Sequence, residues 1–201
     1  DSVDLNQLKR LNPDRSDNLL RYWFGSRGVR MPSTAWLSEM RMQLLEAKED
    51  AQLCVTHADC HIRRHRDRVF LTPKLEIEPA SVLPVTFRWD GEARMRFAAF
   101  GGVLHFDEAG QGVDADWLRS RALTMRYRQG GERLKLAFNR PTKSLKYHYQ
   151  AGDVPAWERE CLPLVIAENH LLFAAGIGMD CHHFSPESGR RIHFRWQSDG
   201  N

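Results

Sequence analysis

Residues 12–50 carry two runs in which apolar side chains recur every three or four positions, the pattern of amphipathic helices. In the first run, Asn12 is placed to cap the helix, Pro13 suits the first helical position and Gly25 can end it. Its apolar stripe comprises Leu19, Leu20, Trp23 and Phe24. Ser33 is placed to cap the second helix. The apolar face of that helix comprises Trp36, Leu37, Met40, Leu44 and Leu45. The two helices predict a hairpin that docks its apolar side on another part of the protein.

From Ala51 onward the apolar positions fall into short runs that are typical of strands. The first runs contain Val55, Ile62, Val69 and Phe70, with turns expected at Ala58-Asp59 and Asp67. Prolines at 73, 79 and 84 then indicate a linker or a domain boundary. Further strand-like segments are 85–89, 93–100, 103–106, 122–128, 163–167, 171–177 and 191–196. One helix, from about Thr142 to Ala151, interrupts them.

This order of segments predicts an α+β protein with two domains. Residues 1–75 are expected to form a small α-helical domain that ends in short strands. Residues 76–201 are expected to form a mixed, β-rich domain with one or two helices.

Composition is typical of a soluble globular protein, with 42% hydrophobic and 27% charged residues in a chain of 201. The most apolar stretch, residues 162–179, is interrupted by Glu168, Asn169 and His170, so we expect no membrane span. No secretory signal is visible, and the chain begins at Asp1 without methionine, which suggests processing or a piece of a longer protein. Four cysteines (Cys54, Cys60, Cys161 and Cys181) are too few for a disulfide scaffold. We therefore expect free thiols and a cytoplasmic location.

Charge is distributed unevenly along the chain. Residues 121–146 carry eight Lys or Arg and a single acid, Glu132, although the net charge of the whole chain is only +3. The remaining residues are mildly acidic. A basic stripe on such a body predicts a localised site for a polyanion, although a solvated cationic face without a ligand is the simpler alternative.

The stripe has features that suit phosphate groups. Alternation along a strand places Arg126 and Arg128 on one face, and Gly130-Gly131 allows a backbone to approach a ligand closely. Thr142 or Ser144 can cap the following helix, whose N–H groups favour an anion, while Leu145 and Tyr149 turn to the core. Lys143 and Lys146 are expected on one side of that helix. The candidate contacts are Arg126, Arg128, Arg133, Lys135, Arg140, Lys143, Ser144 and Lys146.

Other residues offer weaker candidates. Arg21, Arg27 and Arg30 surround the first helix end, where they form either a second basic contact or a solvated surface. Tyr147 lies on the cationic side of its helix and is a candidate for stacking on a base, whereas Trp23, Trp36 and Trp157 are expected to pack internally.

Metal binding and catalysis are not supported by the sequence. Two Cys/His groups (Cys54, His57, Cys60, His61 and Cys181, His182, His183) lack a standard zinc spacing, so we expect no metal. Ser144 and His148 lie one helical turn apart, but no nucleophile, base and orienting residue can be assigned, so we expect no catalytic residue.

Two stretches resemble the tRNA(Ile)-lysidine synthetase family. Residues 130–177 resemble its C-terminal domain through Gly130-Gly131, Arg133, Lys135, Ser144-Leu145-Lys146, Gln150, Val154-Pro155, Trp157, Arg159, Leu162-Pro163-Leu164 and Gly176. Residues 19–71 resemble its central helical domain through Met31-Pro32-Ser33, the pattern Ala47-x-x-Asp50-Ala51 and Ile62-Arg63-Arg64. Over residues 73–120 the chain shows little resemblance to the family.

The resemblance implies a ligase that uses ATP, with Mg²⁺, to attach lysine to the wobble cytidine of an isoleucine tRNA with a CAU anticodon. The modified anticodon then reads AUA instead of AUG. The family's ATP-pyrophosphatase loop, Ser-Gly-Gly-x-Asp-Ser, is absent, because Gly101-Gly102 and Gly130-Gly131 lack its serines and aspartate. This portion is therefore expected to hold no cofactor, to bind tRNA rather than DNA, and to be inactive alone.

The resemblance also assigns residues. It places tRNA-facing positions at Arg128, Arg133, Lys135, Arg140, Ser144 and Lys146, and it allows tRNA contact by the helical domain and a homodimer. The C-terminal part is similar to a module of the phenylalanyl-tRNA synthetase β subunit. Asp153 stands where many relatives carry Gly, and residues 167–172 replace a more usual Gly-Asp turn. The alternative function is a non-catalytic interaction module whose basic patch binds an acidic protein or a generic polyanion.

Overall fold

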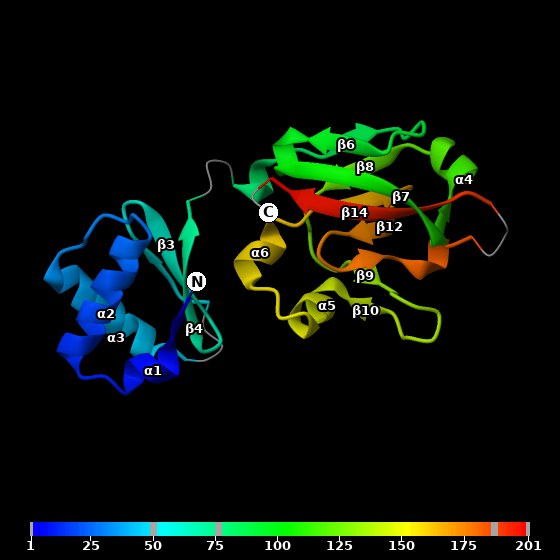
Figure 1. Cartoon of the computed structure of the whole chain (residues 1–201). Coiled ribbons are helices and arrows are strands. Elements are labelled where there is room, and N and C mark those ends of the chain that lie inside the picture. The colour runs from blue at the N-terminus through cyan, green and yellow to red at the C-terminus, as the bar shows by residue number, and fades with distance from the viewer. Residues whose placement is uncertain (1, 49–51, 75–77, 186–188, 200–201) are drawn as a thin grey trace. The chain divides into compact units, whose positions relative to one another are not determined.

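The computed structural model describes residues 2–48, 52–74, 78–185 and 189–199 (Figure 1). The chain divides into two compact units, Asp1–Glu76 and Ile77–Asn201. The expected start of strand-like sequence at Ala51 and part of the proline-marked boundary lie outside the described residues.

The first unit packs helices on an antiparallel sheet. Its elements are β1 (Val3–Asp4), α1 (Leu5–Lys9), α2 (Pro13–Ser26), α3 (Thr34–Glu46), β2 (Cys54–Thr56), β3 (Cys60–His65) and β4 (Arg68–Pro73). The strand order is β1-β4-β3-β2. Apolar residues of α2 and α3, such as Phe24 and Leu37, share one core with Ile62 and Val69 of the sheet. The predicted hairpin therefore docks on the strands that follow it.

Both predicted helix starts are confirmed. Asn12 Oδ1 accepts a hydrogen bond from the Arg15 amide at 2.9 Å, and Ser33 Oγ accepts one from the Trp36 amide at 3.2 Å. The predicted end at Gly25 is wrong, because α2 continues to Ser26 and the left-handed residue is Gly28, with φ of +67°.

Two further details of the first unit differ from the sequence prediction. Leu19 was expected on the buried stripe of α2 but is exposed, so the stripe is narrower than the sequence suggested. Strand β1 and helix α1 were not predicted. In β1, Val3 pairs with Val69 and Asp4 with Arg68, and pairing with so distant a strand leaves no local pattern.

The second unit contains most of the strands. Its elements are η1 (Pro79–Ser81), β5 (Val85–Phe87), β6 (Arg94–Phe97), η2 (Ala98–Phe100), β7 (Gly102–Asp114), α4 (Ala115–Arg119), β8 (Leu123–Arg126), β9 (Arg133–Leu134), β10 (Lys143–Ser144), α5 (Leu145–Ala151), α6 (Ala156–Glu160), β11 (Leu164–Ala167), β12 (His170–Ala174), β13 (Gly178–Met179), η3 (Cys181–His183) and β14 (Arg191–Ser198). They form a five-stranded sheet (β13-β12-β11-β8-β5), a three-stranded sheet (β14-β7-β6) and the hairpin β10-β9. The α+β class is confirmed.

The five-stranded sheet is buried on both faces. Val165 and its cross-strand partners Met125 and Phe173 pack in the core shared with Phe194 of the three-stranded sheet. The preceding residue, Leu164, points to the opposite face, where it packs with Leu145 and Tyr149 of α5 and Leu134 of β9. The unit therefore has three layers, with the hairpin and α5 on one side and the three-stranded sheet on the other (Figure 1).

The predicted helix at Thr142–Ala151 is shorter than expected. Lys143 and Ser144 form β10, so α5 begins at Leu145, with Ser144 Oγ accepting the Tyr147 amide at 3.2 Å. Lys143 therefore does not lie on the helix face that carries Lys146. The prediction that Leu145 and Tyr149 turn to the core is confirmed, because both are buried.

The two departures from the pattern of the resembled family include three residues with left-handed backbone. Asp153, which stands where relatives carry Gly, has φ of +56°. In the turn between β11 and β12, Glu168 and Asn169 have φ of +47° and +69°. Asp and Asn tolerate this region better than most side chains do, which suits Asp153 and Asn169, whereas Glu168 is a less common residue there.

The first residues after β8 are organised by Glu132, the single acid of the basic stripe. Its carboxylate accepts the amides of Gln129 at 2.7 Å and Gly130 at 3.0 Å, and Arg126 Nη1 at 2.9 Å. The side chain of Glu132 is only 7% exposed. Burial alone would raise its pKa, but the hydrogen bonds from Gln129 and Arg126 outweigh it and the pKa lies below the ordinary 4.5.

Among the described residues, all four cysteines are free and no helix is long and apolar enough to cross a bilayer.

Glycines on β7 differ in the space around them, which gives a test of the sheet packing. A Cβ on Gly112 would lie 2.3 Å from the Ile192 carbonyl oxygen, whereas nothing lies within 4 Å of one on Gly110. We expect Gly112→Ala to lower the free energy of unfolding by roughly 1–3 kcal/mol and Gly110→Ala to change it by less than about 0.5 kcal/mol. Urea titrations followed by circular dichroism measure both, and equal losses would contradict the packing described.

Glu132 gives a second test. We expect Glu132→Gln to lower the free energy of unfolding by roughly 1–3 kcal/mol, because it leaves the half-buried Arg126 without a charged partner. The pKa of Glu132 is lower in the folded state, so its stabilisation is complete above about pH 4.5 and is lost as the pH falls through the folded pKa. The difference in the free energy of unfolding between Glu132→Gln and the unaltered chain should therefore become smaller as the pH is lowered. The exposed Glu160→Gln is the control, and a deficit that does not change with pH would refute this role.

Candidate nucleic-acid interface

The predicted basic stripe folds into the β9–β10 hairpin, its connecting loop and α5. Arg133 pairs with Ser144 and Leu134 with Lys143 in the hairpin register. The loop is fixed at its start, because the Lys135 amide donates to Asp180 Oδ2 at 3.3 Å and the Lys135 carbonyl accepts from the Cys181 amide at 2.8 Å. The hairpin is thus attached to η3 as well as to α5.

A buried tyrosine anchors α5. The Tyr149 hydroxyl donates to the Ala175 carbonyl at 2.9 Å, and burial raises its pKa to about 12. The guanidinium carbon of Arg128 lies 5.7 Å from the centre of the same ring. Arg128 therefore packs over the ring of Tyr149. The exposed side of α5 carries Lys146 and Tyr147.

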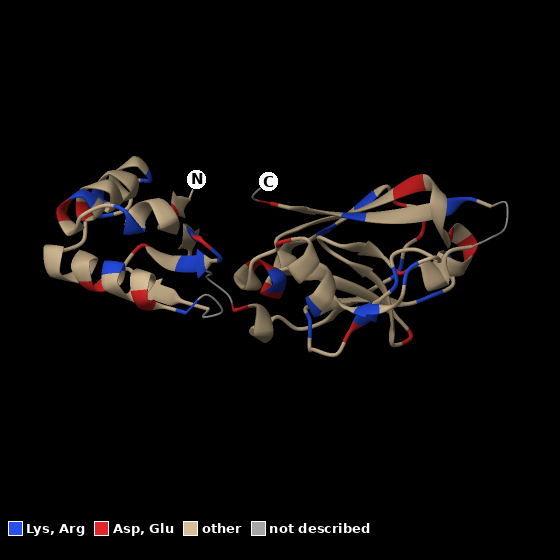
Figure 2. Ribbon diagram, turned by 90° about the horizontal axis from the view of Figure 1, so that it is seen from below, with Lys and Arg blue, Asp and Glu red and all other residues tan. Residues whose placement is uncertain are grey.

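Some cations of the stripe have internal partners. Arg126 pairs with Glu132, and Arg133 Nη2 donates to the Thr142 carbonyl at 3.0 Å although the residue is exposed. The ammonium of Lys143 lies 5.2 Å from the centre of the Tyr147 ring. By contrast, the side chains of Lys135, Arg140 and Lys146 make no hydrogen bond or ion pair within the described part of the chain. These three have no competing carboxylate partner there. Figure 2 marks Lys and Arg in blue and Asp and Glu in red along the ribbon.

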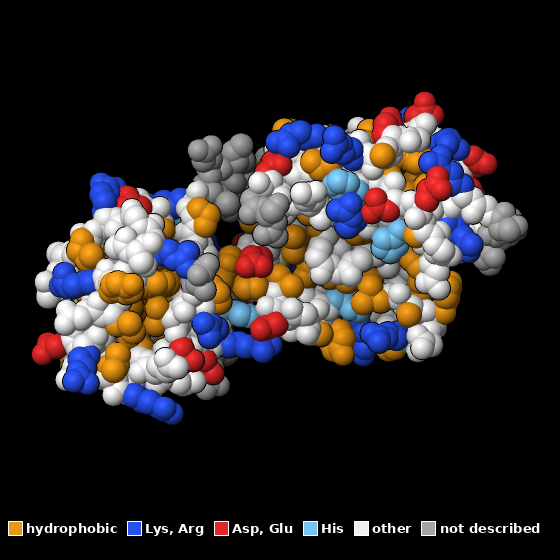
Figure 3. Space-filling view, viewed as in Figure 1, with side chains coloured by type: hydrophobic (Ala, Val, Ile, Leu, Met, Phe, Trp, Pro, Cys, Tyr) orange, Lys and Arg blue, Asp and Glu red, His pale blue; other side chains and the backbone are white. Residues whose placement is uncertain are grey.

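A groove of about 420 Å³ runs between the loop and α5. Arg140, Lys143 and Tyr147 line it, and Leu136 and Ile177 supply apolar surface. No Asp or Glu is among the described residues that line it. Figure 3 shows cationic and hydrophobic side chains side by side on the lower edge of this unit, where β10 and α5 lie in Figure 1.

Two exposed aromatic rings belong to the same region. Phe138 of the loop is 67% exposed and Tyr147 is 52% exposed. The residues Leu136, Ala137 and Phe138 also make the loop more apolar than phosphate binding alone requires. A groove with both cations and apolar surface can take a base as well as a phosphate.

A second hollow, of about 340 Å³, lies beside the start of the hairpin. It is lined by Arg133, by His182 and His183, which the sequence grouped with Cys181, and by His170, which it did not. His182 Nδ1 lies 2.7 Å from Asp180 Oδ1, and burial lowers the pKa of His183. The described residues contain no group of three or more His, Cys, Asp or Glu side chains arranged to hold a metal ion.

The candidate arginines of the first unit are exposed or half-buried. Arg30 pairs with Asp59 at 2.6 Å, and this hydrogen bond holds the Asp59 pKa at about 2. Arg21 Nη2 donates to Thr34 Oγ1 at 2.8 Å, and Arg27 is exposed near the end of α2. Arg21 and Arg30 thus have internal partners, unlike Arg140 and Lys146.

Comparisons with known proteins match both units. Residues 4–70 match the family model described as "TilS substrate binding domain", and residues 123–196 match that described as "TilS substrate C-terminal domain". A tRNA(Ile)-lysidine synthase of Nitrosomonas europaea is 33% identical over 96% of this chain and 42% of its own length. One of Ralstonia nicotianae is 36% identical over 86% of this chain and 39% of its own length.

A solved structure was also found. The one titled "Crystal structure of TILS C-terminal domain" is 20% identical, covers 58% of this chain and 98% of that chain, and has a TM-score of 0.43. The chain spans about two fifths of the length of the curated relatives it matches. Two family models match in the same order as in the sequence analysis. The chain therefore belongs to the tRNA(Ile)-lysidine synthase family and carries that family's substrate-binding and C-terminal domains.

Proposed function

We propose that this chain is the tRNA-binding portion of a tRNA(Ile)-lysidine synthase, which ligates lysine to the wobble cytidine of an isoleucine tRNA. The enzyme name borne by the relatives and the substrate-binding domain matched here support this proposal. ATP and Mg²⁺ would act in the whole enzyme, on a domain that this sequence does not contain. Because tRNA is the substrate, the protein would act in the cytoplasm.

The acid-free groove between the hairpin loop and α5 is the observation that carries the proposal. Polyanionic RNA attracts Lys and Arg that have no competing carboxylate, and each phosphate contact releases counterions. Arg140 and Lys143 line the groove, and Lys146 lies on the adjacent helix turn. We propose these three, with Arg133 and Lys135, as the tRNA contacts.

The other candidate positions have supporting roles in this proposal. Arg126 and Arg128 hold the loop and the Tyr149 anchor, and Ser144 caps α5. The first-unit arginines Arg21, Arg27 and Arg30 are proposed as a secondary contact surface on the same tRNA. Shape and phosphate contacts would dominate, because double-helical RNA presents a wide, shallow groove to proteins.

The first test removes Arg140, which lines the groove, and Lys146, which lies beside it on α5. We expect Arg140→Ala combined with Lys146→Ala to weaken binding of folded tRNA and to reduce the slope of log K against log salt by about 1.5. Filter binding at several salt concentrations measures both. Lys9→Ala combined with Lys74→Ala removes the same charge from exposed positions of the first unit and should have a much smaller effect.

Two outcomes would contradict the proposal. Equal losses for the two double variants would mean that net charge alone determines binding. Competition by heparin at the same charge concentration as effective as that by tRNA would favour the alternative, a module for generic polyanions.

The second test concerns Tyr147, whose exposed ring lies next to Lys143. We expect Tyr147→Ala to weaken tRNA binding by roughly 5- to 100-fold, because stacking of a base on an aromatic ring is lost. Tyr147→Phe keeps the ring and should bind within about twofold of the unaltered chain. If the Phe variant is as weak as the Ala variant, the hydroxyl rather than the ring makes the contact.

A further inference from the structure

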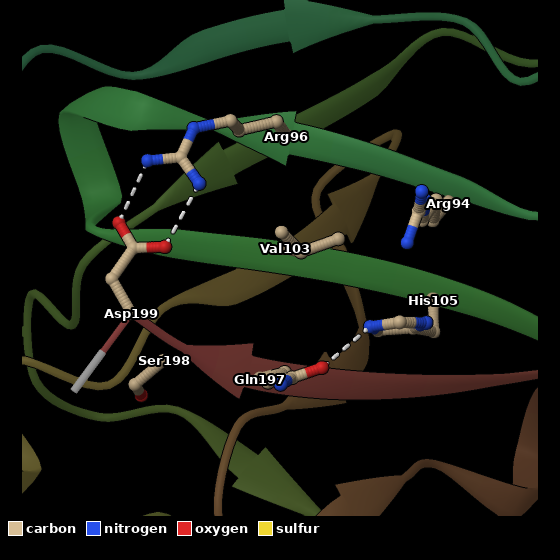
Figure 4. Close-up of a pocket in the computed structure, with 7 residues that line it drawn as sticks. All are labelled: Arg94, Arg96, Val103, His105, Gln197, Ser198 and Asp199. Atoms are coloured by element: carbon tan, nitrogen blue, oxygen red, sulfur yellow. Dashed lines mark hydrogen bonds and ion pairs between the residues drawn. The ribbon is translucent and has the colours of Figure 1, made fainter. Parts of the chain in front are cut away.

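The outer face of the three-stranded sheet carries several arginine side chains and is separate from the groove. Leu104 and Phe106 of β7 point into the core, so the residues between and beside them point outward. The register places Arg94 opposite His105 and Arg96 opposite Val103. On the other side of β7, Gln197 of β14 also lies opposite Val103. Figure 4 shows these side chains around a hollow of about 270 Å³.

The arginines of this face differ in what they contact. Arg94 is exposed and has no hydrogen bond or ion pair among the described residues. Arg96 binds Asp199 through two parallel hydrogen bonds, Nη1 to Oδ1 at 2.9 Å and Nη2 to Oδ2 at 3.0 Å. His105 Nε2 lies 3.1 Å from Gln197 Oε1, which orients the ring toward the hollow (Figure 4).

The Arg96–Asp199 pair has the fork geometry with which arginine also binds phosphate. Both side chains are well exposed, at 61% and 43%, so the pair is weak and a phosphate can replace the carboxylate at little cost. Displacing Asp199 would leave Arg94 and Arg96 as two guanidinium groups on adjacent outward positions of one strand, with His105 beside them.

This face is not assigned by the matched family regions. Residues 94–105 and 197–199 lie outside both matched ranges, 4–70 and 123–196. The face also lies on the opposite side of the five-stranded sheet from α5, so one straight helical stem cannot lie along both surfaces.

We propose that Arg94, Arg96 and His105 form a second binding site for RNA phosphates, which Asp199 occupies in the free protein. The proposal rests on the proposed function, because it makes tRNA the source of the phosphates. Asp199 competes with RNA phosphate for the guanidinium of Arg96. The affinity of the site for phosphate is therefore lower than it would be without Asp199.

The test uses the whole chain and folded tRNA. Arg94→Ala combined with Arg96→Ala should weaken binding and lower the salt slope by about 1.5, as expected for two lost phosphate contacts. Asp199→Asn should strengthen binding by about two- to fivefold, because it frees the Arg96 fork. Glu160→Gln makes the same change in net charge at an exposed position of the same unit and should change binding less. Thermal melts of each variant separate binding effects from unfolding.

The outcomes distinguish the two proposals. If the groove variants weaken binding while the sheet variants leave it unchanged, the second site does not exist and the proposed function stands. If neither set changes binding, both fail. If Asp199→Asn strengthens binding no more than Glu160→Gln does, Asp199 does not occupy the site and the proposal is overturned.

Discussion

The interaction on which the basic surface depends is the buried carboxylate of Glu132. It accepts two backbone amides and the Arg126 guanidinium, so the single acid of residues 121–146 is engaged inside the protein. A carboxylate at the surface in this segment would pair with the nearby cations and reduce their attraction for phosphate. Held where it is, Glu132 instead fixes the glycine turn that leads into β9. Glu132 therefore shapes the hairpin without pairing with the exposed cations of the loop and α5.

The layered packing gives that hairpin a rigid base. Leu134, Leu145 and Tyr149 pack on a sheet whose opposite face is covered by the three-stranded sheet. Binding residues on a loop need such support, because the ordering of flexible side chains and backbone reduces affinity. Arg128 contributes by packing over Tyr149 rather than by facing solvent. The loop cations and Tyr147 are thereby presented from a fixed framework, which suits recognition of a folded RNA by its shape.

Sequence reasoning predicted the parts of this structure that depend on near neighbours. The caps at Asn12 and Ser33, the inward turn of Leu145 and Tyr149, and the α+β order follow from local periodicity and capping. Some errors were local, such as the helix end at Gly25, and others came from pairing between separate segments. Lys143 was assigned to a helix because its pairing with Leu134 across the loop leaves no local signal.

The same reasoning explains what the sequence could not predict about the site. The division of the cations into internally paired and free side chains depends on partners such as Thr142 and Tyr149, which only the fold brings near. The resemblance identified the family, whereas the groove forms only where the fold brings the loop beside α5.

Amide hydrogen exchange of this chain, with and without folded tRNA, tests the central claim most directly. If the groove binds RNA, peptides covering residues 133–152 should exchange more slowly in the complex, because ligand contact suppresses local opening of the loop and α5. Protection elsewhere, with residues 133–152 unchanged at saturating tRNA, would show that the acid-free groove is not the RNA-binding surface.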